Sequence, residues 1–136
     1  MKTYYGKCEC GSSQVSISLP QDLSCYAARA CNCDFCTSQN IAYLSDNKGA
    51  ITIKSVEPLK QIKQGSNQAT FLSCATCLTV ISVAYMTDNI CVGAVNAARL
   101  IEKESLMPSV SISPKNLTAK EKIERWLTLW SPLSIT

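Results

Sequence analysis

The chain has 136 residues, 46% of them hydrophobic and 17% charged, so it can bury a core and does not resemble a disordered protein. Its 13 basic and 10 acidic residues give a dispersed formal charge of +3, which disfavours nucleic acid as a partner. No run approaches the roughly 20 apolar residues of a membrane span, and no signal-peptide pattern precedes Cys8. We therefore expect one domain over residues 1–136, located in the reducing cytosol.

Short segments of alternating polarity predict β-strands through most of the chain. Lys2–Lys7 is expected to pair with Gln14–Leu19, with the bend between them at Gly11. Six further segments have strand character, namely Ile41–Leu44, Ala50–Lys54, Leu59–Lys63, Thr70–Ser73, Thr79–Tyr85 and Ile90–Ala94. Turn-forming residues separate several of them, at Asp46–Gly49, Gly65–Asn67 and Thr87–Asn89. This spacing predicts an all-β fold of several small antiparallel sheets.

One helix is predicted near the C-terminus, over about residues 118–130. Thr118 can cap the helix, Glu121 stands where a capping box needs an acidic residue, and Ala119–Leu129 contains good helix formers. The preceding segment Met107–Pro114 contains two prolines, and we expect it to be an irregular link between the β-body and the helix.

Seven of the nine cysteines fall into three tight clusters, and the chain has no histidine. The clusters are Cys8-x-Cys10, Cys31-x-Cys33-x2-Cys36 and Cys74-x2-Cys77. Such spacings suit metal ligands better than disulfides, and an odd total also disfavours a complete disulfide framework.

The two pairs, Cys8 with Cys10 and Cys74 with Cys77, can together close one four-sulfur zinc site. A tetrahedral zinc with Zn–S bonds of about 2.3 Å needs sulfurs about 3.8 Å apart, whereas residues i and i+2 of a straight strand lie roughly 6.6 Å apart. The chain must therefore bend at the first pair, and Gly11 tolerates the positive φ of such a bend. A structural zinc here would join the first hairpin to the second half of the chain.

The triplet Cys31, Cys33 and Cys36 predicts a second zinc whose fourth position is open, as in catalytic sites. Two alternatives stay open: Cys25 or Cys91 closes the site with a fourth sulfur, or the triplet holds an iron–sulfur cluster. If neither Cys25 nor Cys91 is a ligand, we expect both to be core residues.

Three segments together resemble the family of glutathione-dependent formaldehyde-activating enzymes, which includes centromere protein V. They are Gly6–Gly11 around the first pair, Cys31–Cys36, and Phe71–Cys77. The resemblance extends over roughly residues 4–95 and implies a β-tent fold with zinc as its cofactor. A structural zinc would lie on Cys8, Cys10, Cys74 and Cys77, and a second zinc on Cys31, Cys33 and Cys36.

The resemblance implies a carbon–sulfur lyase that adds a thiol such as glutathione to formaldehyde or a related aldehyde. Arg29, the cation nearest the triplet in sequence, could pair with a substrate carboxylate or be an ordinary surface arginine. The chain departs from the family at Asn32, Thr37 and Leu78; the last of these stands where the family usually has glycine. No departure removes a metal ligand.

A non-catalytic scaffold, in which zinc only holds the fold, is the alternative function. Its docking surface would be an apolar stripe on the predicted helix, although such stripes usually pack on the protein's own core. The stripe comprises Ile123, Trp126, Leu127 and Trp130. The expected partners are a small thiol and an aldehyde, with neither nucleic acid nor membrane, and the sequence leaves the oligomeric state undetermined.

Overall fold

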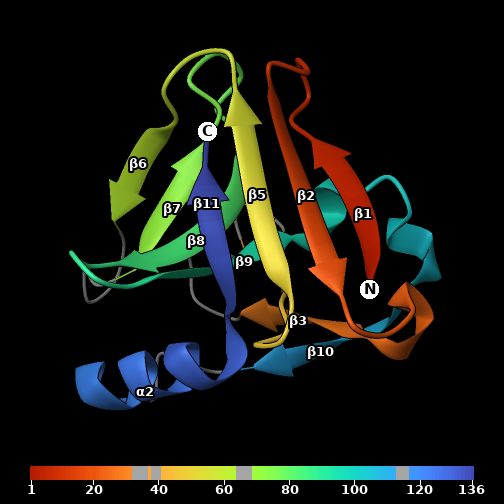
Figure 1. Ribbon diagram of the computed structural model, residues 1–136, viewed down its shortest axis with the longest axis vertical. Helices are drawn as coiled ribbons and strands as arrows, with labels where there is room; N and C mark the ends of the chain where they lie inside the picture. The colour runs from red at the N-terminus through yellow and green to blue at the C-terminus, as the bar shows by residue number, and fades with distance from the viewer. Residues whose placement is uncertain (32–36, 38–40, 64–68, 113–116) are drawn as a thin grey trace.

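The computed structural model describes residues 1–31, 37, 41–63, 69–112 and 117–136. About half of the described residues form β-strands, and the helix α2 (Ala119–Leu129) follows near the C-terminus, as Figure 1 shows. The strands are β1 (Lys2–Lys7), β2 (Ser13–Leu19), β3 (Ala27–Cys31), β4 (Ala42–Leu44), β5 (Ala50–Ser55), β6 (Lys60–Lys63), β7 (Thr70–Ser73), β8 (Val80–Met86), β9 (Cys91–Asn96), β10 (Met107–Ile112) and β11 (Ser131–Ile135). The predicted all-β class with one C-terminal helix is confirmed.

The strands form two layers that β11 joins. Strands β1, β2, β5 and β11 make the front layer in Figure 1, and β7, β8 and β9 pass behind it. Strand β11 pairs with β5 in the front layer and with β9 behind, so it belongs to both. The β11–β5 and β10–β3 pairs are parallel, a difference from the antiparallel pairing that we expected. Long connections between these partners, including helix α2, allow the parallel direction.

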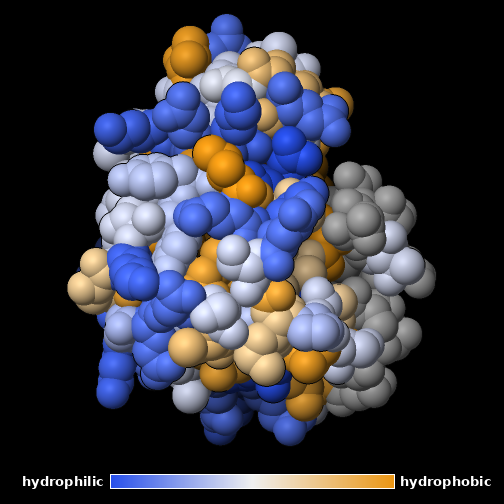
Figure 2. Space-filling model, turned by 90° about the vertical axis from the view of Figure 1, so that its right-hand side faces the viewer, coloured by the Kyte–Doolittle hydropathy of each residue, from blue (hydrophilic) through white to orange (hydrophobic). Residues whose placement is uncertain are grey.

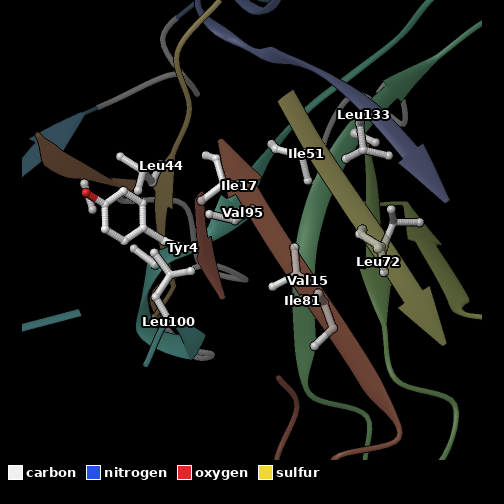
Figure 3. Close-up of a cluster of buried hydrophobic side chains, with 14 of the residues drawn as sticks. Tyr4, Val15, Ile17, Leu44, Ile51, Leu72, Ile81, Val95, Leu100 and Leu133 are labelled. Atoms are coloured by element: carbon white, nitrogen blue, oxygen red, sulfur yellow. The ribbon is translucent and has the colours of Figure 1, made fainter. Parts of the chain in front are cut away.

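The main core fills the space between the layers. Ile17 on β2 and Ile51 on β5 are register partners, and their side chains are 0% and 1% exposed. Figure 3 shows them facing Leu72, Ile81 and Val95 from the strands behind. Burying an isoleucine or leucine side chain stabilises the fold by about 1.5–3 kcal/mol. The alternation in the sequence of β2 therefore stabilises the fold by placing the apolar face of the strand in this core.

The structure contains three strands that the sequence did not predict. Strand β10 occupies most of Met107–Pro114, so the expectation of an irregular link was wrong there. Among the described strands it pairs with β3 alone, with a shift of register between Met107 and Val110, and such an edge tolerates the proline between them. Strands β3 and β11 have weak intrinsic strand character, and pairing with neighbours decides their conformation.

Helix α2 has the predicted limits and the predicted cap. The Thr118 hydroxyl accepts a hydrogen bond from the Glu121 amide at 3.2 Å, and the Glu121 carboxylate accepts one from the Thr118 amide at 2.9 Å. Trp130, directly after the helix, is buried, and Trp126 stacks on it with ring centroids 4.9 Å apart. Of the apolar stripe, Trp126 and Trp130 pack on this protein's own core, Ile123 is half-buried, and Leu127 is exposed.

Exposed apolar side chains are scattered over the described surface. Figure 2 shows the right-hand face of Figure 1, where small apolar areas alternate with larger polar ones. No described helix is both long enough and apolar enough to pass through a membrane.

Candidate metal centre

Four cysteines from two distant hairpins meet at one end of the molecule. The sulfurs of Cys8, Cys10, Cys74 and Cys77 all lie within 4.8 Å of one another. The sulfur–sulfur distances are 3.5 Å between Cys8 and Cys10 and 3.6 Å between Cys10 and Cys74. Both are close to the separation of about 3.8 Å between two sulfurs of a tetrahedral zinc–thiolate site. This cluster, which we call the four-cysteine cluster, could hold a metal ion, as the two predicted pairs require.

The first pair bends as its spacing demands. Cys8 directly follows β1, and its amide donates to the carbonyl of Ser13 at 3.0 Å, while the Gly11 amide donates back to the Cys8 carbonyl at 3.2 Å. Gly11 has a φ of 80°, in the left-handed region that glycine enters without strain. The Ser13 amide also donates to the Cys8 sulfur at 3.3 Å. The predicted bend is therefore confirmed.

The second pair forms a tight turn between β7 and β8. The Cys74 amide donates to the Thr79 carbonyl, and the Leu78 amide donates to the Cys74 carbonyl, both at 2.9 Å. Leu78 has a φ of 62°, the one positive value at a non-glycine residue among those described. Its side chain is 54% exposed. The turn thus forces a branched residue into a conformation that costs roughly 1–2 kcal/mol for an L-residue.

The four thiols differ in their exposure. Cys8 and Cys74 are buried, at 0% and 1%, whereas Cys77 is half-buried and Cys10 is exposed. Each hairpin therefore contributes one sulfur from the core side and one from the solvent side. An ion bound between them would link the β1–β2 turn to the β7–β8 turn, as expected for a site that stabilises the fold.

Two hydroxyl groups that the sequence analysis missed approach the sulfurs. The Ser12 hydroxyl lies 3.1 Å from the sulfurs of both Cys10 and Cys74. The Thr79 hydroxyl lies 3.0 Å from the Cys77 sulfur. Each stands two residues after the second cysteine of its pair, a pattern visible in the sequence. Outer groups of this kind orient metal ligands and affect metal affinity.

Hydrogen bonds favour the thiolate form at the second pair. The backbone amide of Cys77 is the largest cause that lowers the pKa of Cys74, and the Ser12 side chain adds to it, so that the pKa falls to about 5 despite burial. Burial raises the pKa of Cys77, but the Thr79 hydroxyl and the Cys10 amide outweigh it and bring the pKa to about 7. A thiolate is the form that ligates a metal.

In the first pair, the pKa of the exposed cysteine, Cys10, is shifted upward instead. The Ser12 side chain acts to lower the pKa of Cys10, but burial and the neighbouring sulfurs of Cys8 and Cys74 together raise it. Crowded sulfurs disfavour more than one negative charge unless a cation is present. The cluster therefore favours negative charge at Cys74 and Cys77, and a bound cation would extend this to the other two sulfurs.

The second predicted site falls mainly outside the described residues. Cys33 and Cys36 lie there, and Cys31 is described as the last residue of β3, without its side chain. The expectation that Cys25 is a core residue was wrong, because it ends a short 3-10 turn and is exposed. Cys91 is half-buried on β9, where it packs against the main core.

Arg29, which the sequence placed near the triplet, lies on β3 and is half-buried. Its Nη2 donates a hydrogen bond to the Ser45 hydroxyl at 2.6 Å. Burial lowers the pKa of Arg29, and the charge of Arg125 lowers it further. Arg29 is therefore not an ordinary surface arginine.

The fold and the site define a mostly-β protein with a four-cysteine cluster between two hairpins. No family model and no curated protein matches this chain. A similar solved structure is the crystal structure of a Rhodobacter sphaeroides protein that was a structural genomics target, with a TM-score of 0.54 and 23% sequence identity. The match covers 78% of this chain and 99% of the other. At this identity the likeness shows a shared fold alone.

Proposed function

We propose that the four-cysteine cluster binds zinc as a structural ion and that the protein is a zinc-dependent carbon–sulfur lyase. The observation that supports the structural zinc is the convergence of four sulfurs within 4.8 Å from hairpins that are 64 residues apart. Four thiolates fill the first coordination sphere of Zn²⁺ and leave no position for a substrate. The cluster is therefore assigned to stability.

The lyase proposal places the chemistry at Cys31, Cys33 and Cys36. It is supported by the closed four-cysteine cluster, which takes up both cysteine pairs and leaves the triplet for a second ion. It is supported also by the resemblance of the three cysteine segments to formaldehyde-activating enzymes. A zinc ion with three protein ligands supplies a Lewis acid with one open position, where a thiol is deprotonated more easily.

The proposed reaction adds a thiol to an aldehyde and needs no external oxidant or reductant. The sulfur electron pair forms the new carbon–sulfur bond, while the carbonyl π electrons move to oxygen. The proton lost by the thiol ends on that oxygen, which gives an S-hydroxyalkyl product, and the reverse reaction releases the aldehyde. Glutathione and formaldehyde are the substrates that we propose, in the reducing cytosol where thiols persist.

Zinc content and turnover together test the proposal. We expect about two zinc ions per chain in the purified protein and formaldehyde loss that depends on added glutathione. Cys33→Ser should lower the zinc content by about one ion and abolish turnover. Cys25→Ser is the companion variant: unchanged zinc content and turnover would exclude Cys25, an exposed cysteine outside the four-cysteine cluster, as a fourth ligand of the second site.

Two results would separate the parts of the proposal. If Cys33→Ser turned over as fast as wild type, the catalytic role of the triplet would be refuted and the zinc-stabilised scaffold would be favoured. If Cys74→Ser kept a full complement of zinc, the structural assignment of the four-cysteine cluster would be refuted instead. Because Trp126 and Trp130 pack on the core, a scaffold partner would have only Ile123 and Leu127 of the helix stripe to contact.

A further inference from the structure

Two arginines lie on neighbouring elements below the sheet, at the end of the molecule opposite the four-cysteine cluster. Arg29 lies on β3, and Arg125 lies on α2, elements that occupy the lower part of Figure 1. Both side chains are half-buried. Like charges at close range repel, and partial burial strengthens the repulsion.

A hydrogen-bond relay through Ser45 holds the two elements together. Arg29 donates to the Ser45 hydroxyl at 2.6 Å, and that hydroxyl donates to the carbonyl of Leu129 at 2.8 Å. Arg125 lies four residues before Leu129, which is about one turn along the same face of the helix. These hydrogen bonds place the Arg29 guanidinium at the last turn of α2, and in agreement with that placement the charge of Arg125 is, after burial, the next cause that lowers the pKa of Arg29.

No described carboxylate neutralises this pair. Within residues 1–31, 41–63, 69–112 and 117–136 the ion pair present is Lys2 with Asp22, on another part of the surface. Asp46, the residue after Ser45, accepts hydrogen bonds from the Tyr26 hydroxyl at 2.8 Å and the Lys48 amide at 2.9 Å. Glu121, one turn before Arg125, is engaged in the helix cap.

The surroundings make an unpaired cation costly. Tyr43 is the register partner of Arg29 on β4 and is 7% exposed. It belongs to the second core cluster, against which Trp126 and Leu129 also pack. Charges beside apolar groups are poorly solvated, so they are normally paired with an opposite charge.

We propose that Arg29, which is held in place by Ser45, and Arg125 form a binding site for an oxyanion between β3 and α2. The ligand would present a carboxylate or phosphate group, which guanidinium donors recognise with charge-assisted hydrogen bonds. This site stands on its own geometry, and its existence does not depend on the lyase activity.

Tryptophan fluorescence offers a local probe of binding. The two tryptophans of the chain, Trp126 and Trp130, are stacked beside this region, and Trp126 directly follows Arg125. The full-length protein is titrated with inorganic phosphate and, separately, with succinate at low ionic strength. A saturable change is expected with at least one of them, and the tighter probe identifies a phosphoryl or a carboxylate ligand. No saturable change with either probe would overturn the proposal.

Substitutions connect the signal to the two arginines. Arg29→Gln and Arg125→Gln should each weaken binding by about tenfold. Lys120→Gln is the matched control, since it removes one positive charge from an exposed position on the same helix and should leave binding nearly unchanged. Equal weakening by Lys120→Gln would show general charge attraction and refute a built site.

Thermal unfolding gives a second readout that also checks folding of the variants. Without an anion, Arg125→Gln should unfold at a higher temperature than wild type at low ionic strength, because the variant removes the repulsion. The tighter probe should raise the melting temperature of wild type and raise that of Arg125→Gln much less. An equal rise in both proteins would refute the role of Arg125.

Discussion

The four-cysteine cluster and the arginine pair lie at opposite ends of the molecule and present the same physical problem with opposite signs. At the upper end of Figure 1, sulfurs from two turns crowd within 4.8 Å and receive amide and hydroxyl hydrogen bonds that favour negative charge. At the lower end, Arg29 and Arg125 gather positive charge beside an apolar cluster. Among the described residues neither arginine takes part in an ion pair, and our proposals place an anion at that end and a cation at the four-cysteine cluster.

The two regions also differ in how they are encoded. The two thiols of each pair are two or three residues apart in the sequence, so a short stretch of sequence is enough to predict each half of the metal site. The arginines are 96 residues apart by their numbers, 29 and 125, and no local pattern connects them. Charge without a partner in the folded chain is therefore a second criterion for proposing ligand sites, beside the spacing of residues in the sequence.

Of the changes proposed for the two regions, removal of the metal from the four-cysteine cluster should have the largest effect on stability. A strong chelator at neutral pH is expected to lower the free energy of unfolding by on the order of 5 kcal/mol or more, because binding energy of a structural ion is folding energy. Chemical denaturation with and without chelator measures this difference, and chelator already saturated with zinc is the control. Unchanged unfolding would contradict a structural metal.

Single cysteine substitutions should separate the buried from the exposed sulfurs. Cys74→Ala and Cys10→Ala are both expected to lose the metal, since each removes one of four ligands. Cys74→Ala should cost about 1 kcal/mol more, because its side chain is 1% exposed and its removal leaves a cavity. Metal content and denaturation of the two variants check this order, and equal stability would contradict it.

The hydroxyl between the sulfurs should have a smaller effect. Ser12→Ala removes a group 3.1 Å from both Cys10 and Cys74 and is expected to weaken metal binding by about tenfold. Competition with a chelating dye measures the affinity. Ser16→Ala, on β2 away from the cluster, is the control; a similar loss in both variants would exclude a specific role for Ser12.

At the opposite end, alkaline titration should detect the network beside Ser45. Burial, together with the hydrogen bond to Asp46, raises the pKa of Tyr26 to about 12 from an ordinary value of 10.0. The raised pKa favours the neutral phenol in the folded state, so its contribution to stability is complete below pH 10 and is lost as pH rises toward 12. Absorbance titration should show this late step. Asp46→Asn should shift it toward 10, and an unshifted step would contradict the role of Asp46.

Relief of backbone strain at the second cysteine turn should have the smallest effect. Leu78→Gly places a residue tolerant of positive φ where φ is 62°, and the exposed leucine has little packing to lose. We expect a gain of about 0.5–1 kcal/mol, since the greater freedom of glycine in the unfolded chain offsets part of the relief. Thermal unfolding measures it. Leu78→Ala should gain much less, and an equal gain in both variants would contradict the explanation.

The sequence alone determined the local features. Alternation in Gln14–Leu19 determines which face of β2 is buried, the pair Thr118 and Glu121 fixes the start of α2, and Gly11 permits the bend between Cys8 and Ser13. Each of these three features depends on residues close together in the sequence, so it can be predicted before the fold is known.

The tertiary structure alone decided what depends on distant partners. Strand β3 has a sequence with weak strand preference and exists through its pairing with β4 and β10, and β11 joins the two layers after the helix. The connection of Arg29 to α2 through Ser45 and the placement of Ser12 between two sulfurs follow from the same long-range packing. Burial and cross-strand pairing are properties of the assembled chain, and local sequence preferences do not contain them.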